Sequence, residues 1–490
     1  MGITGLLKIF TSIQTDHHIS DYHHQTIGID TYCWIHKAIY LTAHTLMVKS
    51  DLSLFIPPIL SQIETLLSHK IKVVMVFDGG KLLSKVEEEN SREETRNQKQ
   101  AKAKELLLAG DKEAAYKKFA ESVDVTPDLA MLLFKVVKAK YNVICIISPY
   151  EADAQLAYLS RIGFIDAIIT EDSDLLCFGA KKVLYKFNNK GFLKEIELND
   201  WRKCKEFDFK EWTFEQFLSL CILSGCDYLP SLKNIGFKKA YKGLNESRTV
   251  ENLFKRWRMD TKLGFSDEYQ EKFYKAFLTF KFQRVFCPIL RKLSNVNELN
   301  IEIFEKTLKE AGNGNSLGKV MGNFEFLSPI LLGKLKSFKE NEPGLEFLGK
   351  EINDDMACDI ADGMINPISL KEYEEEKLHF EGLIENYREN PEKSRNFLSL
   401  ENRKLINGET LKNLQKKEEN KGKNIENKKF EGRNLISLDN KKIFIKEENF
   451  NNFQIKKEPE TKSDILNKIN NILTNSFFRD FTQIFSSIRG

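Results

Sequence analysis

The sequence Thr26-Ile27-Gly28-Ile29-Asp30 sets a pattern that recurs along the first half of the chain, a short β-branched run that leads into acidic residues. Three further runs do the same: residues 73–77 before Asp78, 143–147 before Glu151 and Asp153, and 167–169 before Asp172 and Asp174. Helical stretches separate the runs, and this alternation predicts an α/β fold with a parallel sheet and helical crossovers. Ligands of such sheets bind beyond the carboxyl ends of the strands, so the acids are expected along one edge.

Composition limits the class of protein. The chain has 490 residues, room for two or three domains, and a formal net charge of only +3 from 74 basic and 71 acidic residues. Any basic surface for a nucleic acid must therefore be local. The eight cysteines form no Cys-x-x-Cys pair, which indicates reduced thiols and argues against a zinc or disulfide framework. With no signal peptide and no apolar run of about 18 residues, we expect a soluble intracellular protein that does not enter a membrane.

Three regions outside this alternation differ in character. Residues 81–123 are rich in Lys, Arg and Glu and predict one or two long, solvated helices with a break at Gly110. Residues 240–345 are mixed, and helical periodicity is clearest there around Phe273, Phe277, Phe280 and Phe282. Residues 400–463 are dominated by Asn, Lys and Glu, and we expect them to be disordered because they cannot bury enough apolar surface to offset chain entropy.

Each acid has a plain structural explanation when it is taken alone. An Asp after a strand often caps the next helix, and Glu151 completes Ser148-Pro149-Tyr150-Glu151, a capping box with Pro at the first helical position. Caps do not, however, require carboxylates in pairs two residues apart. Two such pairs occur here, Glu151 with Asp153 and Asp172 with Asp174, and Asp227 adds a seventh acid after an apolar helix expected over residues 213–224.

Taken together, the acids indicate a site for divalent metal. A dense acidic cluster is costly unless cations neutralise it. Hydrolysis of a phosphodiester needs an activated water and relief of charge on the leaving oxygen, and two Mg²⁺ ions about 4 Å apart supply both. Because Mg²⁺ keeps several waters, some carboxylates are expected to act through water. The sequence therefore predicts a metal-dependent nuclease.

Two other segments have a functional and a structural interpretation. Lys85, Arg92 and Arg96 are spaced for one helical face that could hold a scissile phosphate, yet the glutamates between them are equally typical of a solvated helix with internal ion pairs. Residues 228–239 predict a helix, a tight turn and a second helix. That turn, with Lys238 and Lys239 nearby, could seat a backbone phosphate without reading sequence, although many helix pairs are joined in this way.

Several segments resemble the flap endonuclease/XPG superfamily of structure-specific 5′ nucleases: residues 1–7 (MGITGLL), 30–37 (DTYCWIHK) and 77–79 (FDG). Three others are similar to its exonuclease 1 branch in particular: residues 149–159 (PYEADAQLAYL), 170–176 (TEDSDLL) and 223–229 (LSGCDYL). The resemblance covers roughly residues 1–345, and seven motif carboxylates occur in the order that the family shows.

The resemblance implies a PIN-like αβ nuclease core, a helical arch over the active site and a helix-two-turn-helix (5′-3′ exonuclease C-terminal) subdomain that anchors duplex DNA. On this basis the chain divides into two nuclease regions, 1–99 and 138–229, with the rest of the arch at 100–137 between them. The helix-two-turn-helix and C-terminal nuclease subdomain is expected at 230–345, a polar linker of low order at 346–463, and an amphipathic segment at 464–490.

The resemblance also implies roles for individual residues. The acids that would hold two Mg²⁺ ions are Asp30, Asp78, Glu151, Asp153, Asp172, Asp174 and Asp227. Four of these acids would be catalytic: Asp30, Asp78, Glu151 and Asp174. Lys85 and Arg92 would be catalytic as well, because they engage the scissile phosphate. His36 matches a position near the wedge that bends DNA at the junction, and Arg96, Ile235, Gly236, Lys238 and Lys239 are the other candidate DNA contacts. The anchor binds K⁺ in the family, for which Ser224, Ser231 and Ile235 are the candidates.

One position departs from the family pattern. The turn usually reads Gly-Ile-Gly, whereas this chain has Asn234-Ile235-Gly236. Asn tolerates a left-handed backbone better than most residues, so we expect the turn to survive. How closely a phosphate approaches residue 234 is the property that the substitution puts in question.

The resulting hypothesis is a 5′→3′ double-stranded DNA exonuclease with 5′ flap endonuclease activity, acting in mismatch repair, recombination and end resection. It would recognise DNA by shape, at a 5′ end, nick, gap or flap. The alternatives are a flap endonuclease proper and, in another class, a catalytically silent scaffold that binds DNA structures. We further expect a monomer in the nucleus, and a mismatch-repair partner for residues 464–490, whose apolar face could equally pack on the protein's own core.

Overall fold

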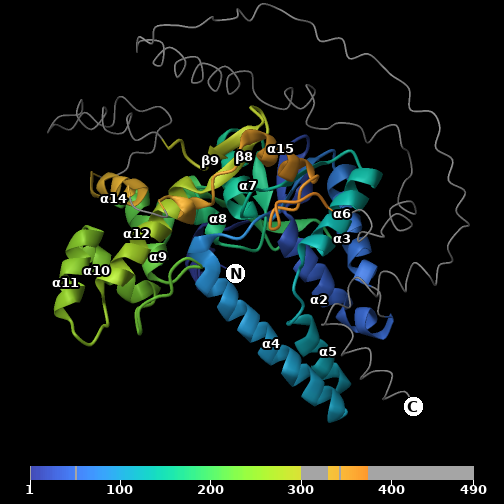
Figure 1. Ribbon diagram of the computed structural model, residues 1–490, viewed down its shortest axis with the longest axis horizontal. Helices are drawn as coiled ribbons and strands as arrows, with labels where there is room; N and C mark the ends of the chain where they lie inside the picture. The colour runs from blue at the N-terminus through green and yellow to red at the C-terminus, as the bar shows by residue number, and fades with distance from the viewer. Residues whose placement is uncertain (1, 50–51, 300–328, 341–343, 374–490) are drawn as a thin grey trace, which may run out of the picture.

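The computed structural model describes residues 2–49, 52–299, 329–340 and 344–373, and the expected disordered stretch and amphipathic C-terminal segment lie outside these ranges. A seven-stranded sheet in the order β1-β7-β6-β5-β2-β3-β4 forms the centre of the molecule (Figure 1). Its strands are β1 (Thr15–His18), β2 (Thr26–Asp30), β3 (Lys72–Phe77), β4 (Ile144–Ile147), β5 (Ala167–Ile169), β6 (Lys182–Tyr185) and β7 (Phe192–Glu197).

The four predicted strand runs are confirmed as β2, β3, β4 and β5, which are neighbours in the sheet and run parallel to one another. β6 extends the parallel part, whereas β7 and β1 join antiparallel at the far edge. The sequence reasoning missed β1, because its four residues are all polar and carry no apolar pattern. It also missed β7, although the sequence FLKEIE of that strand does contain apolar residues. The fold is therefore a mixed sheet with a parallel centre.

Helices cover both faces of the sheet. One core joins alternate side chains of the central strands to α2 (Thr31–Lys49), α3 (Ile56–Ser68) and α6 (Pro127–Lys140). The other joins the intervening side chains to α1 (Leu6–Ile9), α7 (Ala152–Arg161) and α8 (Asp174–Cys177). Because both faces are covered, β2 is buried at every position, as expected for a central parallel strand.

The charged region predicted to be helical forms two antiparallel helices, α4 (Val86–Leu108) and α5 (Lys112–Ala120), which extend away from the body of the molecule (Figure 1). Gly110 separates them with φ of 86°, so the predicted break is confirmed. The two helices pack through a small apolar seam made by Ala103, Leu107, Ala115 and Phe119. We call α4 and α5 the arch.

A helical layer follows the sheet in sequence and lies beside it. It contains α9 (Phe214–Leu223), α10 (Phe237–Ser247), α11 (Val250–Met259), α12 (Asp267–Phe282) and α14 (Pro329–Glu340), with a hairpin of β8 (Arg284–Cys287) and β9 (Lys292–Asn295). The predicted apolar helix before Asp227 is confirmed as α9, and the four phenylalanines predicted to share a helix are all buried on α12. Short 3₁₀ turns complete the fold: η1 (Phe10–Ile13), η2 (Ile19–Tyr22), η3 (Leu52–Phe55), η4 (Leu83–Lys85) and η5 (Leu198–Lys203).

The expectation of a low-order linker from residue 346 is wrong for its first part. Residues 344–373, which we call the C-terminal strap, contain η7 (Glu346–Leu348) and α15 (Asp354–Asp362) and pack on the core. Phe347, Leu348 and Ile360 of the strap are buried. The strap is at least as apolar as the chain as a whole and buries apolar side chains against α12, β4 and the β8–β9 hairpin. The expectation was wrong because it extended to these residues the polar composition of the stretch that follows them.

All eight cysteines are free thiols, as the sequence predicted. Across the ranges that the structure describes, no helix combines the length and the apolar character needed to cross a bilayer.

Gly28 provides a test of how closely the sheet and α7 pack. A Cβ added to Gly28 would lie 2.5 Å from the Ile165 side chain and 2.8 Å from that of Leu156, both of which are buried. Gly28→Val should therefore destabilise the protein by about 1–3 kcal/mol through overpacking. Strand propensity alone predicts the opposite sign, because Val is favoured in strands and Gly is not. Urea unfolding decides between the two, and equal or greater stability of the variant would contradict the packing argument.

Candidate active site

The predicted acids meet at the carboxyl edge of the four central strands. Asp30 is the last residue of β2, and Asp78 directly follows β3. Glu151 and Asp153 stand at the start of α7 after β4, and Asp172 and Asp174 connect β5 to α8. Parallel pairing brings these strand ends together, because Asp30 lies opposite Val76 and Phe77 lies opposite Ile147.

Hydrogen bonds hold the first two acids in place. The Asp30 carboxylate accepts from the Thr170 hydroxyl at 2.7 Å and from the backbone N–H of Cys33 at 3.2 Å. Asp78 accepts from the backbone N–H of Ala152 at 2.7 Å, so it binds the first turn of α7. Each bond leaves further lone pairs on the carboxylate free to bind a cation.

The N-terminus of the chain reaches the same edge. The backbone N–H of Ile3 donates to Asp174 at 2.9 Å, and Asp174 in turn donates its own N–H to Asp172 at 2.9 Å. Gly2 lies so close that a Cβ there would overlap the oxygens of both acids. The sequence reasoning assigned no role to these N-terminal residues, and local sequence could not show one, because the contact spans 171 positions.

The capping-box interpretation of Glu151 is wrong. The helix begins at Ala152, so Glu151 is its N-cap residue, and its side chain makes no capping bond. Ser148 instead donates its hydroxyl to the carbonyls of Phe77 and Tyr150, which ties the ends of β3 and β4 together. The Glu151 carboxylate is therefore free to point into the site.

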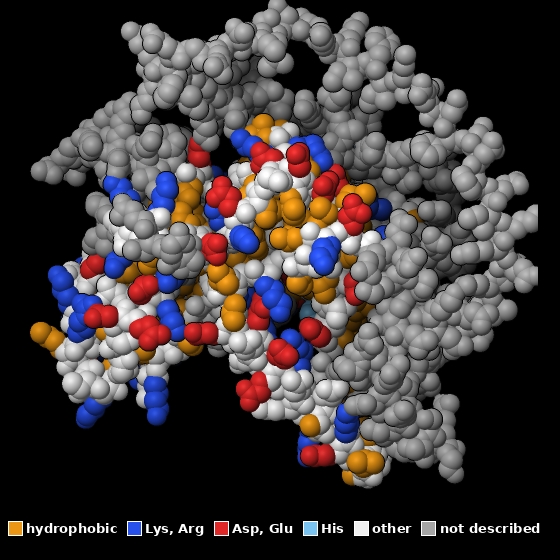
Figure 2. All heavy atoms as spheres, viewed as in Figure 1, with side chains coloured by type: hydrophobic (Ala, Val, Ile, Leu, Met, Phe, Trp, Pro, Cys, Tyr) orange, Lys and Arg blue, Asp and Glu red, His pale blue; other side chains and the backbone are white. Residues whose placement is uncertain are grey.

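Two cations from the base of the arch enter the acidic cluster. The Lys85 ammonium lies 2.5 Å from Glu151 and 2.9 Å from Asp227. The Arg92 guanidinium lies 2.6 Å from Asp227 and 2.9 Å from Glu88. In the space-filling view, acidic and basic side chains gather around a hollow between the arch and the body (Figure 2). These contacts place Asp227 and Lys85 in one site with the strand-end acids.

The predicted helical face of three cations is only partly correct. Lys85 precedes α4 and belongs to η4, whereas Arg92 and Arg96 lie on the helix itself. Arg96 pairs with Asp124 at 3.6 Å, which is not one of the predicted site acids. Of the three predicted cations, Lys85 and Arg92 are therefore the two that pair with acids of the cluster.

The electrostatics show that the acids are crowded. Burial and then repulsion by neighbouring carboxylates raise the pKa of Asp78 to about 7, and burial together with the nearby acids raises the pKa of Asp172 to about 6. The pKa values of Asp153 and Asp174 are raised as well, for the same reasons. Burial opposes ionisation of Asp227 too, but Lys85 and Arg92 outweigh it and lower its pKa. Two cations thus neutralise only one side of the cluster.

The donor set fits divalent ions of the Mg²⁺ type. In the part of the chain that the structure describes, no group of three or more His, Cys, Asp or Glu side chains is placed to hold a metal ion. Mg²⁺ does not require one, since it usually binds one or two carboxylates and keeps several waters. Hard carboxylate oxygens whose mutual repulsion raises their pKa values are the groups that such an ion stabilises.

Tyr228 supports the site but was not among the predicted residues. Its hydroxyl donates to Glu151 and also lies 3.3 Å from the side-chain oxygen of Gln283. Its ring packs edge-on against Phe280 of α12, with the ring centroids 4.9 Å apart. Tyr228 thus holds one oxygen of the Glu151 carboxylate, and Lys85 contacts the other. It stands next to Asp227 in a motif that the sequence analysis quoted, and this adjacency was the available signal.

The predicted DNA-anchor residues lie at the turn between α9 and α10. Asn234 adopts the left-handed backbone with φ of 66°, so the expected turn is formed. A concavity of about 390 Å³ is lined by residues of this turn and of the N-terminus, among them Asn234, Gly236, Lys238, Lys239 and Lys8. Gly236 is the N-cap residue of α10, which leaves free backbone N–H groups beside two exposed lysines.

The remaining candidates differ in exposure. Ile235 packs partly against the core, so its side chain is not free to contact DNA, although its main chain remains available. Ser224 is buried and donates its hydroxyl to the Leu220 carbonyl at 2.7 Å, whereas Ser231 is exposed. His36 is exposed on α2. The roles predicted for these residues in binding DNA or K⁺ stay predictions.

Comparison with known proteins agrees with this site. Residues 1–99 match the model of the XPG N-terminal domain, and residues 142–227 match that of the XPG I-region. The chain is 33% identical over 300 residues to the DNA damage-inducible protein DIN7 of Saccharomyces cerevisiae, which covers 61% of this chain and 70% of that protein. The chain belongs to the exonuclease 1 branch of the XPG family.

Other members of the branch are longer than the aligned region. Exonuclease 1 of Danio rerio is 38% identical over 335 residues, which is 66% of this chain and 41% of that protein. Exonuclease 1 of Drosophila melanogaster is 36% identical over 352 residues, 69% of this chain and 47% of that protein. The chain therefore spans less than half the length of these relatives. A solved structure of the Rad2 catalytic core with DNA aligns over 73% of this chain and 98% of that one, at 18% identity and a TM-score of 0.40, too low a score to bear on function.

The raised pKa of Asp78 predicts how the metal-free protein responds to pH. Its pKa is about 7 in the folded chain against an ordinary value of 3.8, so ionised Asp78 destabilises the fold above pH 7, and the penalty disappears as the pH falls toward 4. Asp78→Asn keeps an oxygen for the Ala152 N–H and removes the charge. In EDTA at pH 8 it should raise the free energy of unfolding by about 1–3 kcal/mol, since one pKa unit is worth about 1.4 kcal/mol and Asp78 keeps some solvent contact.

The matched control for this prediction is Asp166→Asn. Asp166 also accepts a backbone N–H, from Thr26 at 2.8 Å, but it lies at the opposite end of the strands. In urea unfolding at pH 8 and pH 5, only Asp78→Asn should raise the free energy of unfolding. The increase should be smaller at pH 5 than at pH 8. An Asp78→Asn protein no more stable than the control at pH 8 would contradict the account of the crowded acids.

Removing the Tyr228 hydroxyl should loosen Glu151 without disturbing the core. Tyr228→Phe keeps the ring on Phe280 and deletes the bond to Glu151. Mg²⁺ should raise Tm, and the Mg²⁺ concentration that gives half of this rise should increase about tenfold in the variant. Loss of a hydrogen-bond partner of a metal ligand typically weakens metal binding by about this factor. Tyr22→Phe is the control, because it deletes a buried bond of the same kind, from Tyr22 to Glu195 at 2.7 Å, at the β1–β7 edge. Equal Mg²⁺ responses of the two variants would exclude a role for Tyr228.

Proposed function

We propose that the protein is a Mg²⁺-dependent nuclease that degrades duplex DNA from a 5′ end and also cuts 5′ flaps. The observation that supports this most strongly is the convergence of the acids with Lys85 and Arg92 at one sheet edge. A scaffold without catalysis has no need to maintain this crowding, which raises the pKa of Asp78 to about 7. Family membership supports the reaction class, because the relatives bear the name exonuclease 1.

The ion sites would be formed from the strand-end acids. Asp30, Asp78, Glu151, Asp153, Asp172, Asp174 and Asp227 are the candidate ligands, some of them through water. Bound divalent ions would supply an activated water and would neutralise the negative charge that develops on the phosphate and the leaving oxygen. Two ions are part of the proposal, since seven carboxylates on one edge exceed what a single Mg²⁺ ion binds.

Lys85 and Arg92 would act on the phosphate itself. Both reach into the cluster from the base of the arch and now pair with acids there. A scissile phosphate offers oxygens that compete for the same N–H groups, with Arg92 able to grip it through two parallel bonds and Lys85 as a point charge. When divalent ions compensate the acids, these two cations are released to stabilise the charge of the transition state.

DNA recognition would depend on shape. The turn before α10 presents backbone N–H groups with Lys238 and Lys239, which suits a phosphate of the duplex and reads no base. The base of the arch brings Arg92 to the acids, and the arch would limit which DNA strand ends enter the site. Action in mismatch repair, recombination and end resection, binding of K⁺ at the turn, a monomeric state and a nuclear location all remain predictions.

Digestion of a 5′-labelled blunt duplex beside a long 5′ flap tests the proposal. With Mg²⁺ the wild-type protein should release nucleotides from the duplex and also cut the flap, and EDTA should abolish both activities. Asp174→Asn, which keeps an acceptor for the Ile3 N–H, should lower the rate at least about 100-fold while duplex binding stays unchanged. Asp166→Asn should retain activity.

The other outcomes identify the alternatives. Cutting of the flap with an untouched blunt duplex would assign the protein to flap endonucleases proper. If neither the wild-type nor the Asp174→Asn protein cleaves DNA while both bind duplex, the protein is a DNA-binding scaffold without nuclease activity.

A further inference from the structure

The C-terminal strap touches three of the segments that bring catalytic candidates to the site. It contacts the segment after β3 that carries Asp78, the segment after β4 that carries Glu151, and η4, which carries Lys85. The strap lies outside both ranges that match the XPG models, residues 1–99 and 142–227. Its role is therefore not explained by the motifs that define the family.

The first two of these loops are bonded directly to each other. The backbone N–H of Gly79 donates to the Tyr150 carbonyl at 2.5 Å, and that of Gly80 donates to the Pro149 carbonyl at 2.9 Å. A Cβ on Gly79 would overlap the Ser148 carbonyl, so only glycine permits this approach. Asp78 and Glu151 are thus carried on one double loop, and a shift of either segment displaces both carboxylates.

The strap holds this double loop from outside at two points. The Tyr150 hydroxyl donates to the Lys350 carbonyl at 2.5 Å, and the Tyr150 ring lies against Gly349, where a Cβ would overlap it. Gly349 has φ of 107°, a backbone that other residues rarely adopt. At the second point, the Pro367 carbonyl lies 2.9 Å from where a Cβ of Gly80 would stand.

The strap is itself fixed to a different part of the molecule, the β8–β9 hairpin. Arg284 donates to the Gly349 carbonyl and pairs with Glu351 at 3.0 Å. Further along the strap, Arg291 pairs with Asp362 at 2.8 Å. The double loop is therefore attached through the strap to the β8–β9 hairpin and does not depend on its own hydrogen bonds alone.

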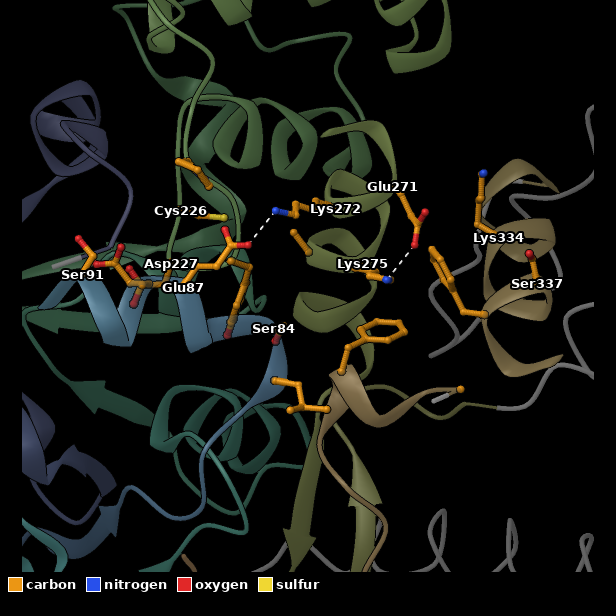
Figure 3. A pocket seen from close by; sticks show the side chains of 18 residues that line it. Ser84, Glu87, Ser91, Cys226, Asp227, Glu271, Lys272, Lys275, Lys334 and Ser337 are labelled. Carbon is orange, nitrogen blue, oxygen red and sulfur yellow. Dashed lines mark hydrogen bonds and ion pairs between the residues drawn. The ribbon is translucent and has the colours of Figure 1, made fainter. Parts of the chain in front are cut away.

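The third contact is with the base of the arch. η7 of the strap packs beside η4, and the two turns share a wall of a cavity of about 750 Å³. Ser84 of η4, Phe347 of η7 and Asp227 all line this cavity, and Figure 3 shows Ser84 and Asp227 on the same side of it. Lys85 follows Ser84 directly, so the position of η7 constrains the point from which Lys85 enters the acids.

We propose that the C-terminal strap is a positioning element of the active site, which holds Asp78, Glu151 and Lys85 in mutual register and thereby sets the affinity for divalent ions. This inference depends on the proposed metal-dependent function. It also gives Tyr150 a role, since this residue of the exonuclease 1-like motif 149–159 is the side chain by which the double loop meets the strap.

Two variants at the contact test this role. Tyr150→Phe removes the bond to the Lys350 carbonyl and keeps the ring, whereas Gly349→Ala pushes the strap away from the ring. Half-saturating Mg²⁺, measured without DNA as the rise in Tm, should increase about tenfold for Gly349→Ala and severalfold for Tyr150→Phe. At limiting Mg²⁺, nucleotide release should fall more for Gly349→Ala than for Tyr150→Phe, and it should recover at high Mg²⁺. Binding of duplex DNA in EDTA should stay at the wild-type level.

Each variant has a matched control away from the site. Gly264 also has a positive φ, 69°, but a Cβ there meets nothing within 4 Å, so Gly264→Ala imposes backbone strain without moving a loop. Tyr22→Phe removes a buried tyrosine hydroxyl bond at the sheet edge. Both controls should bind Mg²⁺ as the wild type does, even where they lower Tm.

The outcomes separate the inference from the function on which it rests. The inference is overturned if Tyr150→Phe and Gly349→Ala lower Tm only as much as their controls do and reach half-saturation at the same Mg²⁺ concentration as the wild type. The strap would then merely stabilise the fold. If Gly349→Ala does not fold, Tyr150→Phe alone decides. If the wild-type protein shows neither a Tm shift with Mg²⁺ nor cleavage, the proposed function itself fails.

Discussion

Repulsion among carboxylates buried at the ends of four parallel strands is the constraint on which the rest of this structure depends. Asp30, Asp172 and Asp174 are all buried, and burial in company with other acids raises the pKa values of Asp172 and Asp174. A protein tolerates such crowding only if its framework is rigid and cations compensate the charge. The sheet supplies the framework, because both of its faces are covered and its central strands are paired up to the ends that carry the acids.

Compensation comes from a part of the chain that is far less buried. Lys85 and Arg92 belong to the base of the arch, which stands out from the body, and an ion pair at 2.8 Å between Glu87 and Lys272 ties that base to α12. The cations that would meet a phosphate are thus carried by an element different from the one that carries the acids. Their register depends on contacts made by η4, α12 and the strap together.

Two errors of the sequence reasoning share one physical cause. Glu151 fits a capping box by spacing, but β3 and β4 bind each other through Ser148, and the helix starts one residue after Glu151. The expected linker groups the strap with the polar stretch that follows it, yet apolar residues of the strap are buried against partners from other elements. In both cases contacts distant in sequence decided the local structure, and a single sequence does not display such contacts.

The sequence by itself determined the parallel strands, the acids that follow them, the two arch helices with their break at Gly110 and the phenylalanine face of α12. These features depend on local periodicity and on residues whose backbone preferences are strong. Tertiary structure alone decided the antiparallel edge of the sheet, the contact of the N-terminus with Asp174, the bond from Tyr228 to Glu151 and the place of the strap. Each of these contacts joins groups that are far apart in the chain. Such a contact stabilises the protein only after the sheet has brought the two groups together.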